Sequence, residues 1–118
     1  MTGAAYKLVD RAEWEAARAD GVYGGSAVDR ADGYIHLSTG EQLAETARRH
    51  YAGRGDLLLV TVELAALGAD LKWDASRGGE LFPHLYGPLP LTATGAERGL
   101  SVTAEGVMTF EDGGSGWR

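Results

Sequence analysis

The stretch DLLLVTV at residues 56–62 carries the strongest strand signal in the chain. Its apolar run is nearly continuous, which is typical of a strand that is buried on both faces. We therefore expect this stretch to be a central strand. Further strands are predicted around it, at residues 6–9, 34–38, 71–73 and 89–94, with a terminal hairpin formed by 100–103 and 107–110.

The first predicted helix covers residues 11–19. Asp10 and Glu13 have the spacing of a capping box at its start, and Gly21 marks its end. Residues 21–33 hold four glycines without clear periodicity. They predict an irregular loop with at most a short strand or a helical turn.

A second helix is predicted to begin after Ser38. Ser38 and Glu41 have the spacing of another capping box, and apolar residues keep helical spacing from there up to Gly53. We expect the Ser38 hydroxyl to accept the backbone N–H of Glu41.

Two helices in the N-terminal half followed by strands in succession indicate an α+β fold with a small mixed, mostly antiparallel sheet. The 118 residues are too few for two well-buried cores, so we expect a single domain over 1–118. The hairpin would occupy 100–110. The glycine-rich tail, 111–118, would be flexible, and Trp117 in it has no expected role.

Composition excludes several classes of function. The formal net charge of −6 and the absence of a long basic run do not favour nucleic-acid binding. Without cysteine the chain has no disulfide, thiol nucleophile or thiolate metal site. Neither a secretion signal nor an apolar run long enough for a bilayer is present, so we expect a cytoplasmic protein. We also expect it to be a monomer or a weak homodimer.

The segment Tyr34-Ile35-His36-Leu37-Ser38 is a first candidate for chemistry. On a strand, alternate side chains share a face, so Tyr34, His36 and Ser38 would lie together, next to Thr39 at the start of a helix. The alternative is structural: a buried histidine and a capping serine.

The segment from Glu80 to Pro90 is the second candidate and contains all three prolines. Prolines restrict their own φ and bias the preceding residue towards extended geometry, so the segment would be a stiff, extended loop. His84 and Tyr86 would then project to one side. The alternative is an edge strand with a packed tyrosine. Trp73, which ends a predicted strand just before the turn that leads to Glu80, is expected to form a pocket wall.

The motifs Gly-Tyr-Ile-His-Leu-Ser at 33–38 and Phe-Pro-His-Leu-Tyr-Gly-Pro-Leu at 82–89 together resemble the bacterial family called domain of unknown function 952. The resemblance covers about residues 6–93. It implies a compact α+β domain and a distant relationship to the ADP-ribosyltransferase fold. In that fold a strand histidine holds the ribose of NAD and aromatic side chains flank the nicotinamide.

Carried to this chain, the resemblance makes His36 a partner of a ribose hydroxyl, with Ser38 beside it and Tyr34 or Tyr86 as a stacking face. It supplies no clear catalytic carboxylate: Glu80 is the candidate nearest the second motif. We expect His36 and His84 to approach each other across one concave site.

Three interpretations stay open. The site belongs to an ADP-ribosyltransferase-like enzyme, active or degenerate, that uses His36, His84 and Glu80 on NAD or another ribose-containing ligand. Alternatively, the same pocket is a non-catalytic module that binds a nucleotide-like small molecule. A third interpretation is a metal site of two histidines and one carboxylate, although no HxH or HxxxH spacing supports it. We therefore name no metal ligand and no certain cofactor.

Overall fold

The computed structural model describes residues 3–114 of the protein. In this part of the chain the strands are β1 (Ala4–Asp10), β2 (Val22–Tyr23), β3 (Ile35–His36), β4 (Leu57–Glu63), β5 (Leu71–Ser76), β6 (Glu80–Leu85), β7 (Leu89–Pro90), β8 (Thr94–Val102) and β9 (Met108–Phe110). The α-helices are α1 (Arg11–Asp20), α2 (Ala27–Asp32) and α3 (Leu43–His50). Short 3-10 turns cover Leu64–Ala66, Gly68–Asp70, Arg77–Gly79 and Leu91–Ala93.

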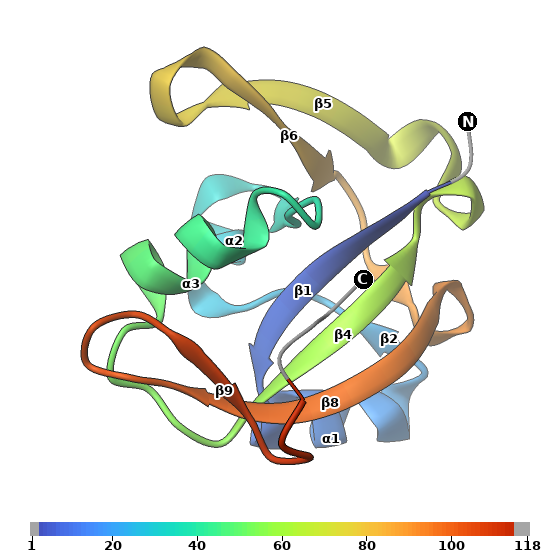
Figure 1. The fold of residues 1–118 in the computed structure, drawn as a ribbon. Helices are drawn as coiled ribbons and strands as arrows, with labels where there is room; N and C mark the ends of the chain where they lie inside the picture. The colour runs from blue at the N-terminus through green and yellow to red at the C-terminus, as the bar shows by residue number, and fades with distance from the viewer. Residues whose placement is uncertain (1–2, 115–118) are drawn as a thin grey trace.

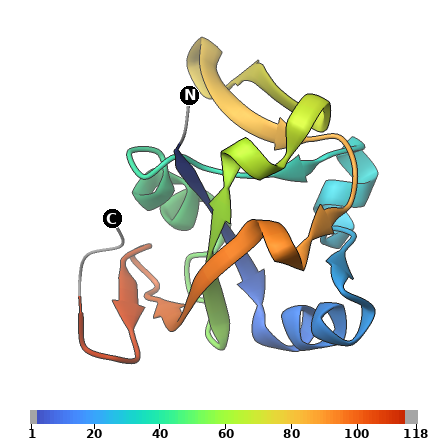
Figure 2. The same cartoon turned by 90° about the vertical axis from the view of Figure 1, so that its right-hand side faces the viewer.

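The strands form three sheets, ordered β1-β4-β8-β9, β3-β6-β5 and β2-β7. Every pairing between these named strands is antiparallel. Figure 1 shows the β5–β6 hairpin at the top, the four-stranded sheet across the middle and bottom, and α2 and α3 to the left between them. Figure 2 shows α1 at the end of the molecule opposite the hairpin. The predicted α+β class is confirmed.

Strand β4 has the central position predicted for DLLLVTV, since it pairs with β1 on one side and β8 on the other. Its side chains alternate between two apolar clusters. Leu57 and Leu59 enter the cluster on the α3 side, whereas Leu58 and Val60 enter the cluster that contains Trp14 of α1. Burial on both faces is why this strand reads as a continuous apolar run.

The segment between α1 and β3 is more regular than the glycines suggest. Besides the short β2, it forms α2, a six-residue helix and not a single turn. Both bonds of a capping box join Ser26 and Asp29 at its start, and Gly33 ends it in the left-handed conformation with a φ of +90°. The Ser-x-x-Asp spacing of residues 26–29 is the sequence pattern from which this helix could have been predicted.

Neither predicted capping box forms. Asp10 makes no side-chain cap at the start of α1. Ser38 does not cap Glu41 either: its hydroxyl is 2.8 Å from that of Thr46, and the reciprocal bonds join Thr39 and Gln42. Residues 39–42 form a turn, so α3 starts at Leu43, later than predicted.

The proline-rich segment contributes a middle strand, β6, between β3 and β5. Pro83 lies in it, and its carbonyl accepts the Leu37 N–H beyond the end of β3. In extended backbone the N and C=O of one residue point to the same side, so the N–H that proline lacks would also face the region beyond β3. The ladder with β5 therefore loses no bond to the proline, and only the return bond to Leu37 is missing, at the point where β3 has ended.

The C-terminal part departs from prediction in two places. The predicted strand 89–94 is divided into β7, a 3-10 turn and the first residue of β8. Strand β8 begins at Thr94, earlier than the predicted hairpin, because it pairs with β4 along most of its length. Trp117 lies outside the described residues. Over 3–114, no helix is long and apolar enough to cross a membrane.

Candidate functional site

Pairing of β3 with β6 brings the two sequence motifs together. His36 lies directly opposite His84 in the register of the two strands, so both side chains project from the same face. Their ring centroids are 5.5 Å apart at an interplanar angle of 69°. The expected approach of the two histidines is confirmed.

Tyr34 is the centre of an aromatic cluster around these histidines. Its ring is stacked on His84 with centroids 4.1 Å apart, and it lies 4.7 Å from the ring of His36 and 5.1 Å from that of Tyr86. Tyr86 is 42% exposed, so part of the cluster faces solvent. The cluster thus offers aromatic surface next to imidazole nitrogens.

Two carboxylates hold the ring of His36. Nδ1 is 2.6 Å from Oδ1 of Asp29, and Nε2 is 3.0 Å from Oδ2 of Asp32. Both nitrogens can donate only when the ring is an imidazolium, because a neutral imidazole carries one N–H.

Asp29 is also the partner of a buried lysine. Nζ of Lys7 is 2.9 Å from Oδ2 of Asp29 and donates to the carbonyl of His36 at 3.1 Å. Both side chains are almost fully buried. Burial alone would raise the pKa of Asp29, but hydrogen bonds from His36 and Lys7 and the charge of Lys7 outweigh it and hold the pKa well below its usual range. Burial lowers the pKa of Lys7, and Asp29 opposes that shift.

Local backbone geometry places Asp29. It is the third residue of α2 and the acidic member of the capping box, so its carboxylate also accepts the Ser26 N–H at 2.9 Å. Gly25 has a φ of +106°, and a Cβ at this position would lie 2.9 Å from Cβ of Asp29. Glycine at position 25 is therefore required for both the turn and the close approach.

His84 is oriented by a different carboxylate. Its Nδ1 is 2.9 Å from Oδ2 of Asp74, and the same oxygen accepts the Tyr86 hydroxyl at 2.5 Å. The hydrogen bond from Tyr86, followed by that from His84, lowers the pKa of Asp74, and Asp74 in turn raises the pKa of Tyr86 to about 12. With an ionised Asp74 the proton of a neutral His84 sits on Nδ1, which leaves Nε2 as a basic acceptor.

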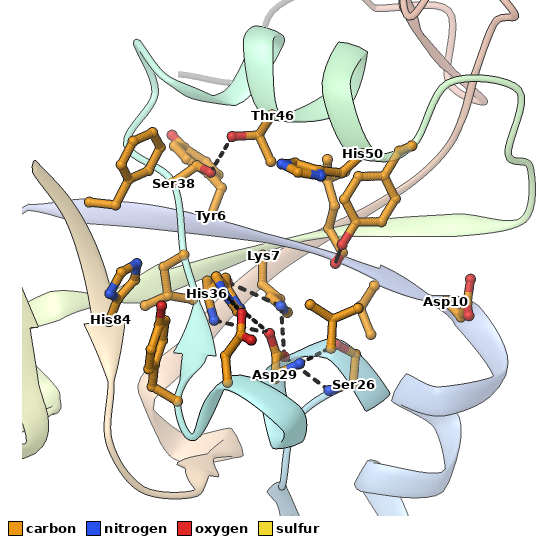
Figure 3. Close-up of a pocket in the computed structure, with 18 of the residues that line it drawn as sticks. Tyr6, Lys7, Asp10, Ser26, Asp29, His36, Ser38, Thr46, His50 and His84 are labelled. Atoms are coloured by element: carbon orange, nitrogen blue, oxygen red, sulfur yellow. Dashed lines mark hydrogen bonds and ion pairs between the residues drawn. The ribbon is translucent and has the colours of Figure 1, made fainter. Parts of the chain in front are cut away.

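A cavity of about 550 Å³ is lined by both histidines and, among the groups around them, by Lys7, Asp29, Asp32 and Tyr34. Figure 3 shows His84 at one end of the labelled side chains and Asp10 at the other, with Lys7, Asp29 and His36 between them. The cavity wall includes four carboxylates, from Asp10, Glu13, Asp29 and Asp32, but only two permanently charged basic side chains, Lys7 and Arg54. Its charge favours a ligand group that is positive or rich in hydrogen-bond donors.

The predicted site residues are placed as follows. Tyr34, His36, Ser38 and His84 line this cavity. Tyr86 lines a neighbouring cavity of about 310 Å³ that shares Tyr34 and Asp29 with the first.

The cavity wall does not include the other three predicted site residues, which are Thr39, Trp73 and Glu80. Thr39 bonds Gln42, and Trp73 is 46% exposed on β5. Glu80 accepts a bond from Nε2 of Gln42 at 3.2 Å. The proposed metal set of His36, His84 and Glu80 is therefore not assembled, and among the described residues no group of three or more potential ligands is placed to hold a metal ion.

Sequence reasoning missed the charged partners of the histidines: Lys7, Asp29, Asp32 and Asp74. Lys7 could have been noticed as a charge inside an apolar strand, and Asp29 as part of a Ser-x-x-Asp pattern. Asp74 and Asp32 carried no distinctive signal, because their roles depend on strand register and on the position of α2.

The fold and the cavity define a small antiparallel α+β protein with a pocket of paired histidines and carboxylates. Residues 8–96 match the family described as "Protein of unknown function (DUF952)", and the chain belongs to this family. No curated protein matches the chain.

Two solved structures of one relative are similar to the whole fold. The crystal structure of protein CC0527 from Caulobacter crescentus is 53% identical in sequence, with a TM-score of 0.84 over 89% of this chain and 92% of that chain. The solution NMR structure of CC0527 is also 53% identical, with a TM-score of 0.76 over 87% and 89% of the two chains.

Proposed function

We propose that the cavity binds a ribose-containing ligand, NAD or a related nucleotide, and that the protein acts on it as an ADP-ribosyltransferase-like enzyme. The observation that carries this proposal is the clustering of Tyr34, His36 and His84 at one end of the cavity. An imidazole hydrogen-bonds hydroxyl groups, and an aromatic ring provides a stacking face for a planar base.

The charge of the cavity suits one half of NAD better than the other. The nicotinamide ring is cationic and would be favoured next to Asp32 and Asp29. The diphosphate would be disfavoured there by the excess of carboxylates. In this proposal the nicotinamide ribose enters the cavity and the ADP part lies outside it.

The chemistry assigns separate tasks to the two histidines. His36, held by Asp29 through Nδ1, presents Nε2 to a ribose hydroxyl, which takes the place of Asp32 at that nitrogen. The bond from the ribose C1′ to the nicotinamide nitrogen breaks, and nicotinamide leaves as a neutral molecule with the electron pair. Nε2 of His84 takes the proton of an acceptor X–H, while X forms the new bond to C1′.

The carboxylates complete the proposed site. Those of Asp32 and Asp29 stabilise the positive charge that develops on the ribose as the glycosidic bond breaks. Asp74 contacts Nδ1 of His84 and so orients its ring, as the third member of a catalytic triad orients the imidazole. Glu80 has no role here, because it does not line the cavity.

Calorimetric titration tests binding. NAD, ADP-ribose and AMP are titrated into the wild-type protein, with a chelator present, and nicotinamide release from NAD is followed by chromatography. His36→Ala and Tyr34→Leu should each weaken NAD binding about tenfold or more, since each removes a direct contact. His84→Gln should reduce nicotinamide release more than binding.

Two matched controls come from residues outside the cavity wall. Trp73→Leu and Glu80→Gln should bind and release as the wild type does. Binding without release of nicotinamide would identify the non-catalytic module instead of the enzyme. If none of the three compounds bound at millimolar concentration, or if His36→Ala bound equally well, the nucleotide proposal would be wrong.

A further inference from the structure

Tyr23 has a buried hydroxyl without a hydrogen-bond partner. The residue is 4% exposed, and its ring packs against Trp14 with centroids 5.4 Å apart. Its hydroxyl is the buried side-chain atom that lacks a partner among the described residues. A buried unsatisfied polar group costs stability, so a native protein that retains one calls for an explanation.

The Tyr23 side chain belongs to the wall of the large cavity, together with Glu13 and Asp29. Burial raises the pKa of Tyr23, and the charges of Asp29 and Glu13 raise it further. The hydroxyl therefore lies within the field of two carboxylates.

Glu13 is the one carboxylate of this wall without a basic partner among the described side chains. The other three are paired: Asp29 with Lys7, Asp32 with His36, and Asp10 with Arg54 at 2.6 Å. A hydrogen bond joins the Glu13 and Asp10 carboxyls. Glu13 itself is exposed, so a ligand can reach it from solvent.

The basic side chain that contacts Asp10, the hydrogen-bond partner of Glu13, is already engaged. The guanidinium of Arg54 contacts Asp10 and lies over the ring of Tyr51, 5.0 Å from its centroid. The Tyr51 hydroxyl, in turn, donates to the carbonyl of Leu8 at 3.0 Å. Burial and the bond to Asp10 raise the pKa of Glu13, and the charges of Arg30 and Arg54 offset this only in part.

We infer that Glu13 and the Tyr23 hydroxyl form a second subsite, which binds a cationic nitrogen group such as a primary ammonium. An ammonium donates three hydrogen bonds and accepts none. It can therefore donate to the Glu13 carboxylate and to the oxygen of Tyr23, which supplies a basic partner to the first and a hydrogen-bond partner to the second. An anion would meet the charges of Glu13 and Asp10 and is disfavoured.

Glu13 is bonded to Asp10, which Figure 3 shows at the opposite end of the labelled side chains from His84. Lys7 and Asp29 stand between the two ends. The inference therefore does not depend on the nucleotide proposal, and each can fail without the other.

The probe is ethylammonium chloride, titrated into the ¹⁵N-labelled protein and followed by NMR. The backbone amide signals of residues 13 and 23 should shift along a saturable curve. Sodium acetate at the same ionic strength should not produce this curve. Glu13→Gln should weaken the apparent affinity about tenfold, and Tyr23→Phe about threefold or more, because each removes one of the proposed contacts.

Glu41→Gln is the matched control, since it removes an exposed carboxylate that does not line the cavity. It should bind ethylammonium as the wild type does. Glu13 is exposed, so its variant should fold even if Tyr23→Phe does not. The inference is wrong if ethylammonium gives no saturable shift, if acetate gives the same shift, or if Glu13→Gln binds with unchanged affinity.

Discussion

Asp29 fixes both the side chain and the backbone of His36. Its Oδ1 atom is 2.6 Å from the ring Nδ1 and 3.2 Å from the backbone nitrogen of the same histidine. Through Oδ2 it also binds Lys7 of β1. One buried carboxylate therefore links β1, α2 and β3 at the site.

Replacement of Asp29 by asparagine should strongly destabilise the protein. Lys7 would remain buried without its counter-charge, and breaking one half of a buried ion pair costs about 3–5 kcal/mol. Urea denaturation at neutral pH measures the loss. Asp32→Asn is the control: that side chain is 46% exposed, so its loss should cost less than about 1 kcal/mol.

The effect of Asp29 should also depend on pH. The pKa of Asp29 lies below its ordinary value of 3.8 in the folded protein. The stability it contributes is therefore fully present above the pKa of the unfolded chain and is lost as the pH falls towards the folded pKa. The difference between wild type and Asp29→Asn should shrink below about pH 4. A difference that stays constant down to acid pH would contradict this assignment.

Tyr86 should report directly on Asp74. In the wild type its pKa is raised to about 12, first of all by the hydrogen bond to Asp74. In Asp74→Asn the acceptor loses its charge, so the pKa of Tyr86 should fall towards the ordinary value of 10.0. NMR of the tyrosine ring carbons resolves this titration, with Tyr86→Phe to assign the signal. An unchanged titration would mean that the contact is absent in solution.

The sequence pattern was sufficient to predict those helices and strands whose structure depends mainly on their own residues. The apolar run of β4 and the helix that ends at Gly21 could both be predicted, because burial and capping leave a mark in adjacent residues. The approach of His36 to His84 was expected from their chemically mixed faces, whereas the strand pairing that produces it was not.

The rest of the site depends on contacts between distant residues. The Lys7–Asp29 pair joins β1 to α2, and the Asp74–His84 pair joins β5 to β6, so neither spacing is visible in the sequence. Gly24 and Gly25 led to the prediction of a loop, because glycines favour loops. In the structure they lie just before the capped helix α2.

The start of α3 provides a test between two capping patterns. Thr39 and Gln42 exchange bonds in the structure, whereas Glu41 is exposed and makes no bond to Ser38. Thr39→Ala should lower the free energy of unfolding by about 0.5–2 kcal/mol. Glu41→Ala should leave it within about 0.5 kcal/mol of the wild type. Chemical denaturation separates these outcomes, and a large loss in Glu41→Ala would restore the pattern predicted from sequence.

Tyr23→Phe should be tolerated or stabilising in the protein without ligand. It removes a buried hydroxyl that has no partner, and such a group costs about 1–3 kcal/mol when left unsatisfied. Tyr51→Phe is the matched control, because its hydroxyl donates to Leu8 at 3.0 Å and its loss should cost about 1 kcal/mol.

The two variants should therefore shift the urea midpoint in opposite directions, with unchanged dependence on denaturant. If Tyr23→Phe were more stable than the wild type but bound ethylammonium more weakly, the Tyr23 hydroxyl would contribute to ligand binding at a cost in folding stability. If Tyr23→Phe lost as much stability as Tyr51→Phe, the Tyr23 hydroxyl would have a partner in the free protein, such as an ordered water. The second subsite would then contain no unsatisfied hydroxyl, and the inferred role of Tyr23 in it would be wrong.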